Sequence, residues 1–125
     1  MENIMRLKIA AILAAISIAL AAFGTHGLKN ILSSTQLNTF ETATTYLFWH
    51  IIAIFIVIIF EKLNKTKPNH ACTLFFTGIS LFSGSLYLYL ATQLKFLVYI
   101  TPIGGLCFIA GWITFAINLK NKQYH

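Results

Sequence analysis

Four long apolar segments, separated by short polar stretches, run along the chain. They cover residues 7–28, 42–60, 71–92 and 96–119, and each is close to the ~20 residues that a helix needs to cross ~30 Å of hydrocarbon. Segments of this length without strict alternation of polar and apolar residues exclude membrane-spanning strands. Backbone groups within lipid must be bonded inside their own segment, which leaves helices. The pattern predicts an all-α membrane protein, with residues 1–125 forming one four-helix transmembrane domain.

The breaks between the segments predict two kinds of connection. Only residues 92–95 interrupt the apolar run between the third and fourth segments, so we expect a tight turn and a helical hairpin there. Ahead of the second segment, Ser33 and Gln36 match a capping box, in which two side chains satisfy free amides at a helix start. A short interfacial helix should therefore begin near Ser34 and lead into the second span.

Composition places the chain in lipid and not in water. Hydrophobic residues make up 58% of the chain and charged residues 10%, whereas soluble domains have about 25% charged residues. A soluble chain of 125 residues could not bury so much apolar surface. The net charge of +6 does not indicate a nucleic-acid partner, because the basic residues cluster at segment ends and do not interleave with aromatic residues.

The distribution of basic residues predicts the orientation of the chain. Only Lys29 and Lys95 lie at one end of the segments, and the other seven lysines and arginines lie at the opposite end: Arg6, Lys8, Lys62, Lys65, Lys67, Lys120 and Lys122. Basic residues concentrate on the cytoplasmic side, so both termini should be cytoplasmic. Residues 19–21 resemble a signal-peptidase site, but the apolar pattern continues past them, and we expect a retained first span.

Small residues recur at helical spacing on three segments. These stripes comprise Ala10, Ala14, Ser17, Ala21 and Gly24 on the first segment, Ser80 and Gly84 on the third, and Gly104, Cys107 and Gly111 on the fourth. Small residues let membrane helices approach closely, so the stripes predict a tightly packed bundle, with a dimerisation seam as the alternative interpretation. The two cysteines, Cys72 and Cys107, should lie at different depths and therefore remain unbridged.

Acidic residues are almost absent from the apolar segments. The chain has no aspartate, and Glu2, Glu41 and Glu61 lie at or beyond the segment edges. No carboxylate pair is thus placed for acid–base catalysis inside the membrane, and no buried acid for proton coupling. A haem held by His26 and His50 is disfavoured, because these histidines should lie at different depths. We expect no catalytic residues, no metal site and no cofactor.

Polar and helix-breaking residues gather in the outer halves of the segments, meaning the halves away from the predicted cytoplasmic side. His50 follows the start of the second segment by eight residues, or roughly 12 Å, and Thr101 and Pro102 have a similar depth in the fourth. An ionisable residue inside the membrane suggests a functional site, although a neutral histidine bonded across helices also fixes packing. The candidate cluster comprises His26, Tyr46, His50, Ser83, Ser85, Tyr87, Thr101, Pro102, Gly104 and Gly105.

Within this cluster we predict that His50 is neutral and hydrogen-bonded to the third or fourth segment. Its candidate partners are Ser83, Ser85, Tyr87, Thr101 and the carbonyls freed by Pro102. Proline removes a helical hydrogen bond, and Gly104 and Gly105 weaken the same region further. Broken membrane helices can line binding cavities, whereas a proline–glycine kink can also be only a packing device.

Five sequence strings, in this order and spacing, closely resemble the YgdD-like membrane proteins, the family called domain of unknown function 423, with relatives known as transmembrane protein 256. The strings are Phe23–Leu28, Thr42–His50, Leu81–Tyr87, Thr101–Leu106 and Gly111–Trp112. Thr25 stands where the family more often has alanine. The resemblance covers nearly the whole chain and implies a small inner-membrane protein with four helices. It implies no reaction, because the family is uncharacterised.

Three classes of function are compatible with these features. An accessory or structural membrane component is favoured by the small-residue stripes and the sparse chemistry. A small carrier or channel for a neutral or lipid-like solute is the second class, and a histidine-dependent cofactor protein or enzyme is the third. We expect the cytoplasmic (inner) membrane of a bacterium, or the mitochondrial inner membrane of a eukaryote. The expected partners are the lipid bilayer and either another membrane protein or further copies of the chain.

Overall fold

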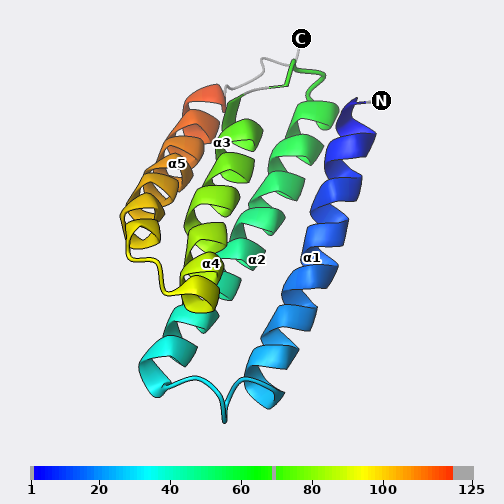
Figure 1. Ribbon diagram of the computed structural model, residues 1–125. Coiled ribbons are helices and arrows are strands. Elements are labelled where there is room, and N and C mark those ends of the chain that lie inside the picture. Colours follow the sequence, from blue (N-terminus) through cyan, green and yellow to red (C-terminus); the bar gives the residue numbers. More distant parts are fainter. Residues whose placement is uncertain (1, 69, 120–125) are drawn as a thin grey trace.

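The computed structural model describes residues 2–68 and 70–119, which form a bundle of helices (Figure 1). The elements are α1 (Glu2–His26), α2 (Ser34–Leu63), α3 (His70–Gly78), η1 (Ile79–Ser83), α4 (Gly84–Thr92) and α5 (Phe96–Asn118). Because α3, η1 and α4 follow one another without a break, they form one span. The described residues therefore contain four helical spans long and apolar enough to cross a membrane, and the predicted all-α four-helix class is confirmed.

Neighbouring spans along the chain run in opposite directions. The start of α1, the α2–α3 connection and the end of α5 lie together at one end of the bundle (Figure 1). We call this the basic end, since it carries Arg6, Lys8, Lys62, Lys65 and Lys67. Lys29 and Lys95 lie in the connections at the other end of the bundle, which we call the opposite end. Lys120 and Lys122 lie outside the described residues. The arrangement fits an even number of spans, and the cytoplasmic location of the termini stays a prediction.

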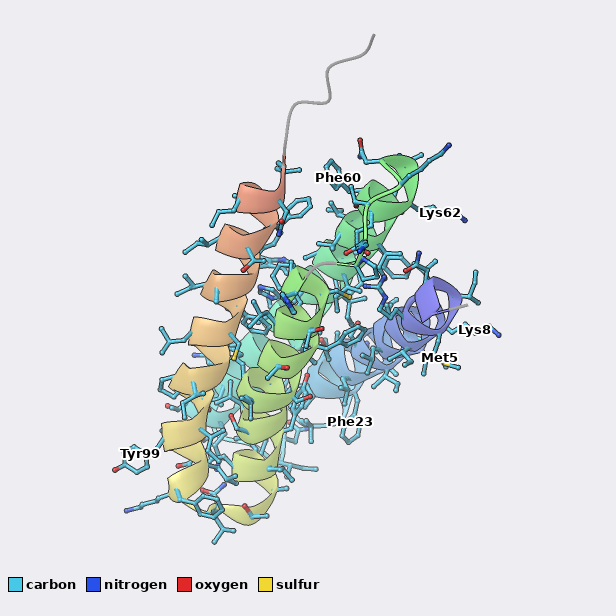
Figure 2. The ribbon with its side chains drawn as sticks, turned by 90° about the horizontal axis from the view of Figure 1, so that it is seen from above. Met5, Lys8, Phe23, Phe60, Lys62 and Tyr99 are labelled. Atoms are coloured by element: carbon cyan, nitrogen blue, oxygen red, sulfur yellow. The ribbon has the colours of Figure 1, made fainter. Side chains whose placement is uncertain are left out.

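Helix α2 is the centre of the bundle. It packs against α1 on one side and against α3, η1 and α4 on the other, while α3 and η1 also pack closely on α5. Helix α1 lies at the edge, with α2 as its main neighbour, and it is the least buried of the four spans. Figure 2 shows Met5 and Lys8 on the outer side of α1, and Tyr99 of α5 pointing away from the bundle.

The small-residue stripe of α1 lies largely in its contact with α2. Ala10, Ser17 and Gly24 are buried and Ala14 is half-buried, as the spacing predicted. Ala21 is exposed, because the two helices leave a groove at its level. At Gly24 a side chain would overlap the ring of Phe40, so the glycine permits the close approach of α1 to α2 near the opposite end.

The start of α2 has the predicted capping box. The Ser33 hydroxyl oxygen accepts a hydrogen bond from the Gln36 amide at 3.1 Å, and the Ser33 amide donates to Gln36 Oε1 at 3.0 Å. Helix α2 then continues unbroken to Leu63, so the expected short interfacial helix forms the first turns of this span. Glu61 accordingly belongs to α2, whereas the second apolar segment was expected to end at residue 60.

The third span contains a π-helical turn, η1, that the sequence did not predict. It lies where Gly104 of α5 packs against the third span. A Cβ atom on Gly104 would overlap the backbone of Leu81 and Phe82 in η1, so only glycine fits this crossing. The chain then turns tightly between Thr92 and Phe96, as predicted, and α5 runs unbroken through Pro102.

Candidate functional site

The outer part of the predicted cluster binds the third span to α2. The hydroxyl groups of Thr44 and Tyr87 lie 2.6 Å apart. Since Thr44 donates its own proton to a backbone carbonyl of α2, the Tyr87 hydroxyl is the donor in this pair. One turn deeper in the third span, the buried Ser83 hydroxyl donates to the Ala43 carbonyl at 2.7 Å. Two candidate residues, Tyr87 and Ser83, are therefore bonded to Thr44 and Ala43 of α2, and neither is the partner of His50.

A second pair of hydroxyl groups joins the third span to α5. The Ser85 and Thr101 side-chain oxygens lie 2.5 Å apart, with Ser85 buried and Thr101 half-buried. Gly104 lies one turn further along α5, at its crossing with η1. Pro102, the residue after Thr101, is exposed on the outer surface of α5. These contacts place Ser85, Thr101 and Gly104 in one layer, where they hold two spans together.

His50 uses both of its ring nitrogens within the protein. Its Nδ1 lies 2.7 Å from the Tyr46 carbonyl oxygen, and its Nε2 lies 3.2 Å from the Trp112 indole nitrogen. An indole nitrogen can only donate and a carbonyl can only accept, so these bonds fit a neutral imidazole with its proton on Nδ1. The predicted bond from His50 to the fourth span is present, but none of the predicted partners makes it.

The true depth of His50 explains why Trp112 replaces the expected partners. Helix α2 begins at Ser34, so His50 lies 16 residues after the helix start and not eight after residue 42. Trp112 likewise lies 16 residues after Phe96, the start of α5 at the same end of the bundle. Both side chains therefore sit about 24 Å along their helices, whereas Thr101 lies much closer to the opposite end.

Aromatic rings surround this deeper histidine. The His50 ring, only 4% exposed, stacks on Phe108 with centroids 3.5 Å apart and planes within 10°. The Tyr46 ring packs on Phe82 at 4.9 Å between centroids, so it contacts the third span. A groove of about 430 Å³ opens beside these rings, lined by Tyr46, Trp49, His50, Phe82, Gly105, Phe108, Ile109 and Trp112. The arrangement is an apolar groove containing one imidazole whose nitrogens are already bonded.

His26 belongs to neither polar layer. It is exposed at the end of α1, two residues beyond Gly24, which lies at the level of Phe40. Phe40 precedes His50 by ten residues, or about 15 Å along α2. The two histidines are therefore at different depths, as expected. Within residues 2–68 and 70–119, no three His, Cys, Asp or Glu residues gather where they could hold a metal ion.

The sequence pattern did not predict an ion pair that lies at the basic end. Arg6 Nη2 of α1 donates to Glu61 Oε2 of α2 at 2.9 Å, and Arg6 also contacts the side chain of Asn3. Glu61 is only 2% exposed and Arg6 is 16% exposed, so the pair is largely removed from solvent. The available signal was that Arg6 and Glu61, of opposite charge, lie at the same end of antiparallel spans.

Comparison with known proteins gives a consistent set of relatives. Residues 20–105 match the family described as "Protein of unknown function (DUF423)". A "UPF0382 membrane protein" of Staphylococcus aureus (strain bovine RF122 / ET3-1) is 43% identical over 104 residues, covering 83% of this chain and 85% of the relative. "UPF0382 membrane protein YwdK" of Bacillus subtilis is 38% identical over 109 residues, covering 86% and 89%. A "UPF0382 membrane protein" of Haemophilus influenzae is 36% identical over 107 residues, covering 85% and 86%. No solved structure matches the chain.

Proposed function

The chain belongs to the DUF423 family of membrane proteins, and on this premise we propose that it is a non-catalytic accessory component of the bacterial cytoplasmic membrane. In this role it acts by associating with another membrane protein. The family match confirms the resemblance found in the sequence. The relatives named above come from bacteria and are named as membrane proteins, which supports a bacterial membrane as the location.

The observation that carries this proposal is how the interior uses its polar side chains. Four pairs each join two different spans: Thr44–Tyr87, Ser85–Thr101, His50–Trp112 and Arg6–Glu61. In the described part of the chain, Arg6 Nε is the only buried side-chain nitrogen or oxygen without a hydrogen-bond partner. Interhelical hydrogen bonds fix packing in membranes. The interior polar groups thus hold the bundle together, which supports a structural role.

The outer surface supports association in the bilayer. All four spans expose large apolar side chains, among them Ile12 on α1, Trp49 on α2, Leu88 on α4 and Leu106 on α5. Exposed apolar surface on this scale marks a protein whose neighbours are lipid or other proteins. Helices of a second membrane protein can pack on such a surface by van der Waals contact.

A carrier for a neutral or lipid-like solute is the second candidate, and the groove beside His50 favours it. With about 430 Å³ and mostly aromatic walls, this groove has the size and lining of a small-molecule site. The hydroxyl groups of the predicted cluster are less favourable as a solute path, because Ser85 and Thr101 bond to each other and Ser83 bonds to α2. Uptake of labelled solutes into liposomes that contain the purified chain would support the carrier over the accessory component.

Stoichiometric co-purification tests the proposed function. A tagged chain at its natural expression level would be cross-linked in intact membranes, solubilised in mild detergent and purified, with another tagged four-span protein as the control. We expect one membrane protein in near-equimolar amounts that is absent from the control. Recovery of the chain alone, with and without cross-linking, would contradict an accessory role.

A further inference from the structure

Two adjoining cavities form one groove between α1 and α2. They have volumes of about 300 Å³ and 270 Å³, and Ala21, Thr44 and Thr45 line both of them. We call this continuous depression the α1–α2 groove. It lies along α1, the least buried of the four spans, which rests at the edge of the bundle with α2 as its main neighbour (Figure 1).

The lining of the α1–α2 groove changes from polar to apolar along its length. The part nearer the opposite end of the bundle is lined by Thr25 and Glu41, together with Gly24 and Phe40. Phe48 and Trp49 line the part nearer the middle, together with Ile18 of α1. From Glu41 to Trp49 the groove follows eight residues of α2, or about 12 Å. A polar mouth at the membrane surface and an apolar floor below it match the two parts of a lipid.

Charge at the polar mouth selects the kind of lipid. The exposed Glu41 carboxylate forms no ion pair with any residue that the structure describes, whereas Glu61 at the basic end is paired with Arg6. Glu41 lies directly before the uncharged part of α2, at the edge of the hydrocarbon. A carboxylate there attracts a cation and repels an anionic head group. The nearby hydroxyl groups of Thr25 and Thr45 add hydrogen-bond acceptors for a group that carries N–H donors.

We propose that the α1–α2 groove binds one phospholipid whose head group carries a primary ammonium, as in phosphatidylethanolamine. The ammonium lies at Glu41 and donates to its carboxylate, and an acyl chain lies against Phe48 and Trp49. A primary ammonium has three N–H donors, whereas the quaternary ammonium of phosphatidylcholine has none. The site therefore distinguishes two lipids of the same net charge.

The size of the groove favours a lipid over a helix of a partner protein. A helix about 10 Å in diameter occupies about 900 Å³ over a 12 Å length. The two adjoining cavities, at about 300 Å³ and 270 Å³, together hold only about two-thirds of that volume. A flexible acyl chain fits a depression of this volume without moving α1. Lipid in this position would also fill the gap that the exposed Ala21 leaves in the contact between α1 and α2.

Lipid retention tests the proposal directly. The full chain would be reconstituted into vesicles of equal parts phosphatidylethanolamine, phosphatidylcholine and phosphatidylglycerol, then extracted in mild detergent and measured by native mass spectrometry. We expect one phosphatidylethanolamine per chain, enriched several-fold over phosphatidylcholine. Equal retention of these two lipids, or preferential retention of phosphatidylglycerol, would overturn the proposal.

Matched variants locate the site. Glu41→Gln should lower the ratio of bound phosphatidylethanolamine to phosphatidylcholine to that of the vesicle. Ala21→Trp should remove bound lipid by filling the groove, while Ala22→Trp, at an exposed neighbouring residue that does not line it, should retain the lipid. An unchanged lipid ratio in Glu41→Gln would overturn the proposal.

A head-group series with the unaltered chain keeps the proposal falsifiable if a variant fails to fold. Each added N-methyl group removes one donor from the ammonium, so retention should fall stepwise from phosphatidylethanolamine through its mono- and dimethyl forms to phosphatidylcholine. The same retention across the series would overturn the assignment of a primary ammonium to this groove.

Discussion

The indole N–H of Trp112 donates a hydrogen bond to Nε2 of His50 over 3.2 Å, and this bond joins α5 to α2 in the interior of the bundle. The same imidazole reaches the Tyr46 carbonyl through Nδ1 and stacks on Phe108. Three contacts therefore fix one ring that is 4% exposed. A histidine held in this way contributes to helix packing, and the contribution can be measured.

His50→Leu should lower the thermal unfolding midpoint in detergent more than His50→Gln does. Leucine leaves the Trp112 N–H without its acceptor, whereas the glutamine carbonyl can still accept a hydrogen bond. Interhelical hydrogen bonds in membrane proteins average about 0.6 kcal/mol, so a double-mutant cycle with Trp112→Phe should give a coupling of about 0.5–1.5 kcal/mol. Equal midpoints for the two His50 variants and a coupling near zero would remove the structural role of this bond.

Gly104→Ala should destabilise the protein, whereas Gly105→Ala should leave its stability nearly unchanged. A Cβ on Gly104 would lie about 2.7 Å from the Leu81 carbonyl carbon and would also overlap the Phe82 backbone. The nearest atom to a Cβ on Gly105 is Phe82 Cδ2, at 3.8 Å. Overpacking of this kind costs about 1–3 kcal/mol. Thermal unfolding of both variants checks the difference, and equal stability would show that α5 does not cross η1 this closely.

The Arg6–Glu61 pair should anchor the basic end of α1 to α2. Glu61→Leu leaves the Arg6 guanidinium without its main partner, and we expect a loss of about 1–3 kcal/mol, since removing one member of a buried pair is more costly than removing both. The double variant Arg6→Leu/Glu61→Leu should recover part of this loss. Lys62→Leu, at the exposed neighbouring residue, is the control. A double variant less stable than Glu61→Leu would contradict this account.

A reporter that works only in the cytoplasm should be active when it is fused after His125, and a reporter that works only outside the cytoplasm should be silent there. The expectation rests on seven of the nine lysines and arginines lying at one end of the segments. The described spans agree with it, because the start of α1 and the end of α5 lie at the same end of the bundle. Activity of an external reporter at this site, together with a silent cytoplasmic one, would contradict this orientation.

Local features of the fold could be predicted from the sequence. The four spans follow from length and hydropathy, and the start of α2 follows from Ser33 and Gln36, whose side chains reach the backbone three residues away. The tight turn before Phe96 follows from the short polar break. Each of these depends on neighbouring residues and on the lack of water in the bilayer, so no knowledge of helix rotation is needed.

The pairing across helices could not be predicted in the same way. Outward and inward faces of a membrane helix are both apolar, since lipid is as apolar as a core, so the sequence does not show which face of α5 meets His50. Trp112 was therefore overlooked as its partner. The partners expected in its place were Ser83, Ser85, Tyr87, Thr101 and the carbonyls freed by Pro102. The contact of the π-helical turn η1 with α5 likewise involves residues far apart in the sequence, because α5 approaches η1 at Gly104.

The central claim is that the polar pairs hold the bundle together while the protein acts by association with another membrane protein. The molar ratio of co-purified partner to chain, measured by quantitative mass spectrometry after cross-linking in intact membranes, tests it most directly. The account predicts a ratio near one for the unaltered chain and the same ratio for folded His50→Gln. A chain recovered without a partner, or a folded His50→Gln that has lost it, would contradict the account.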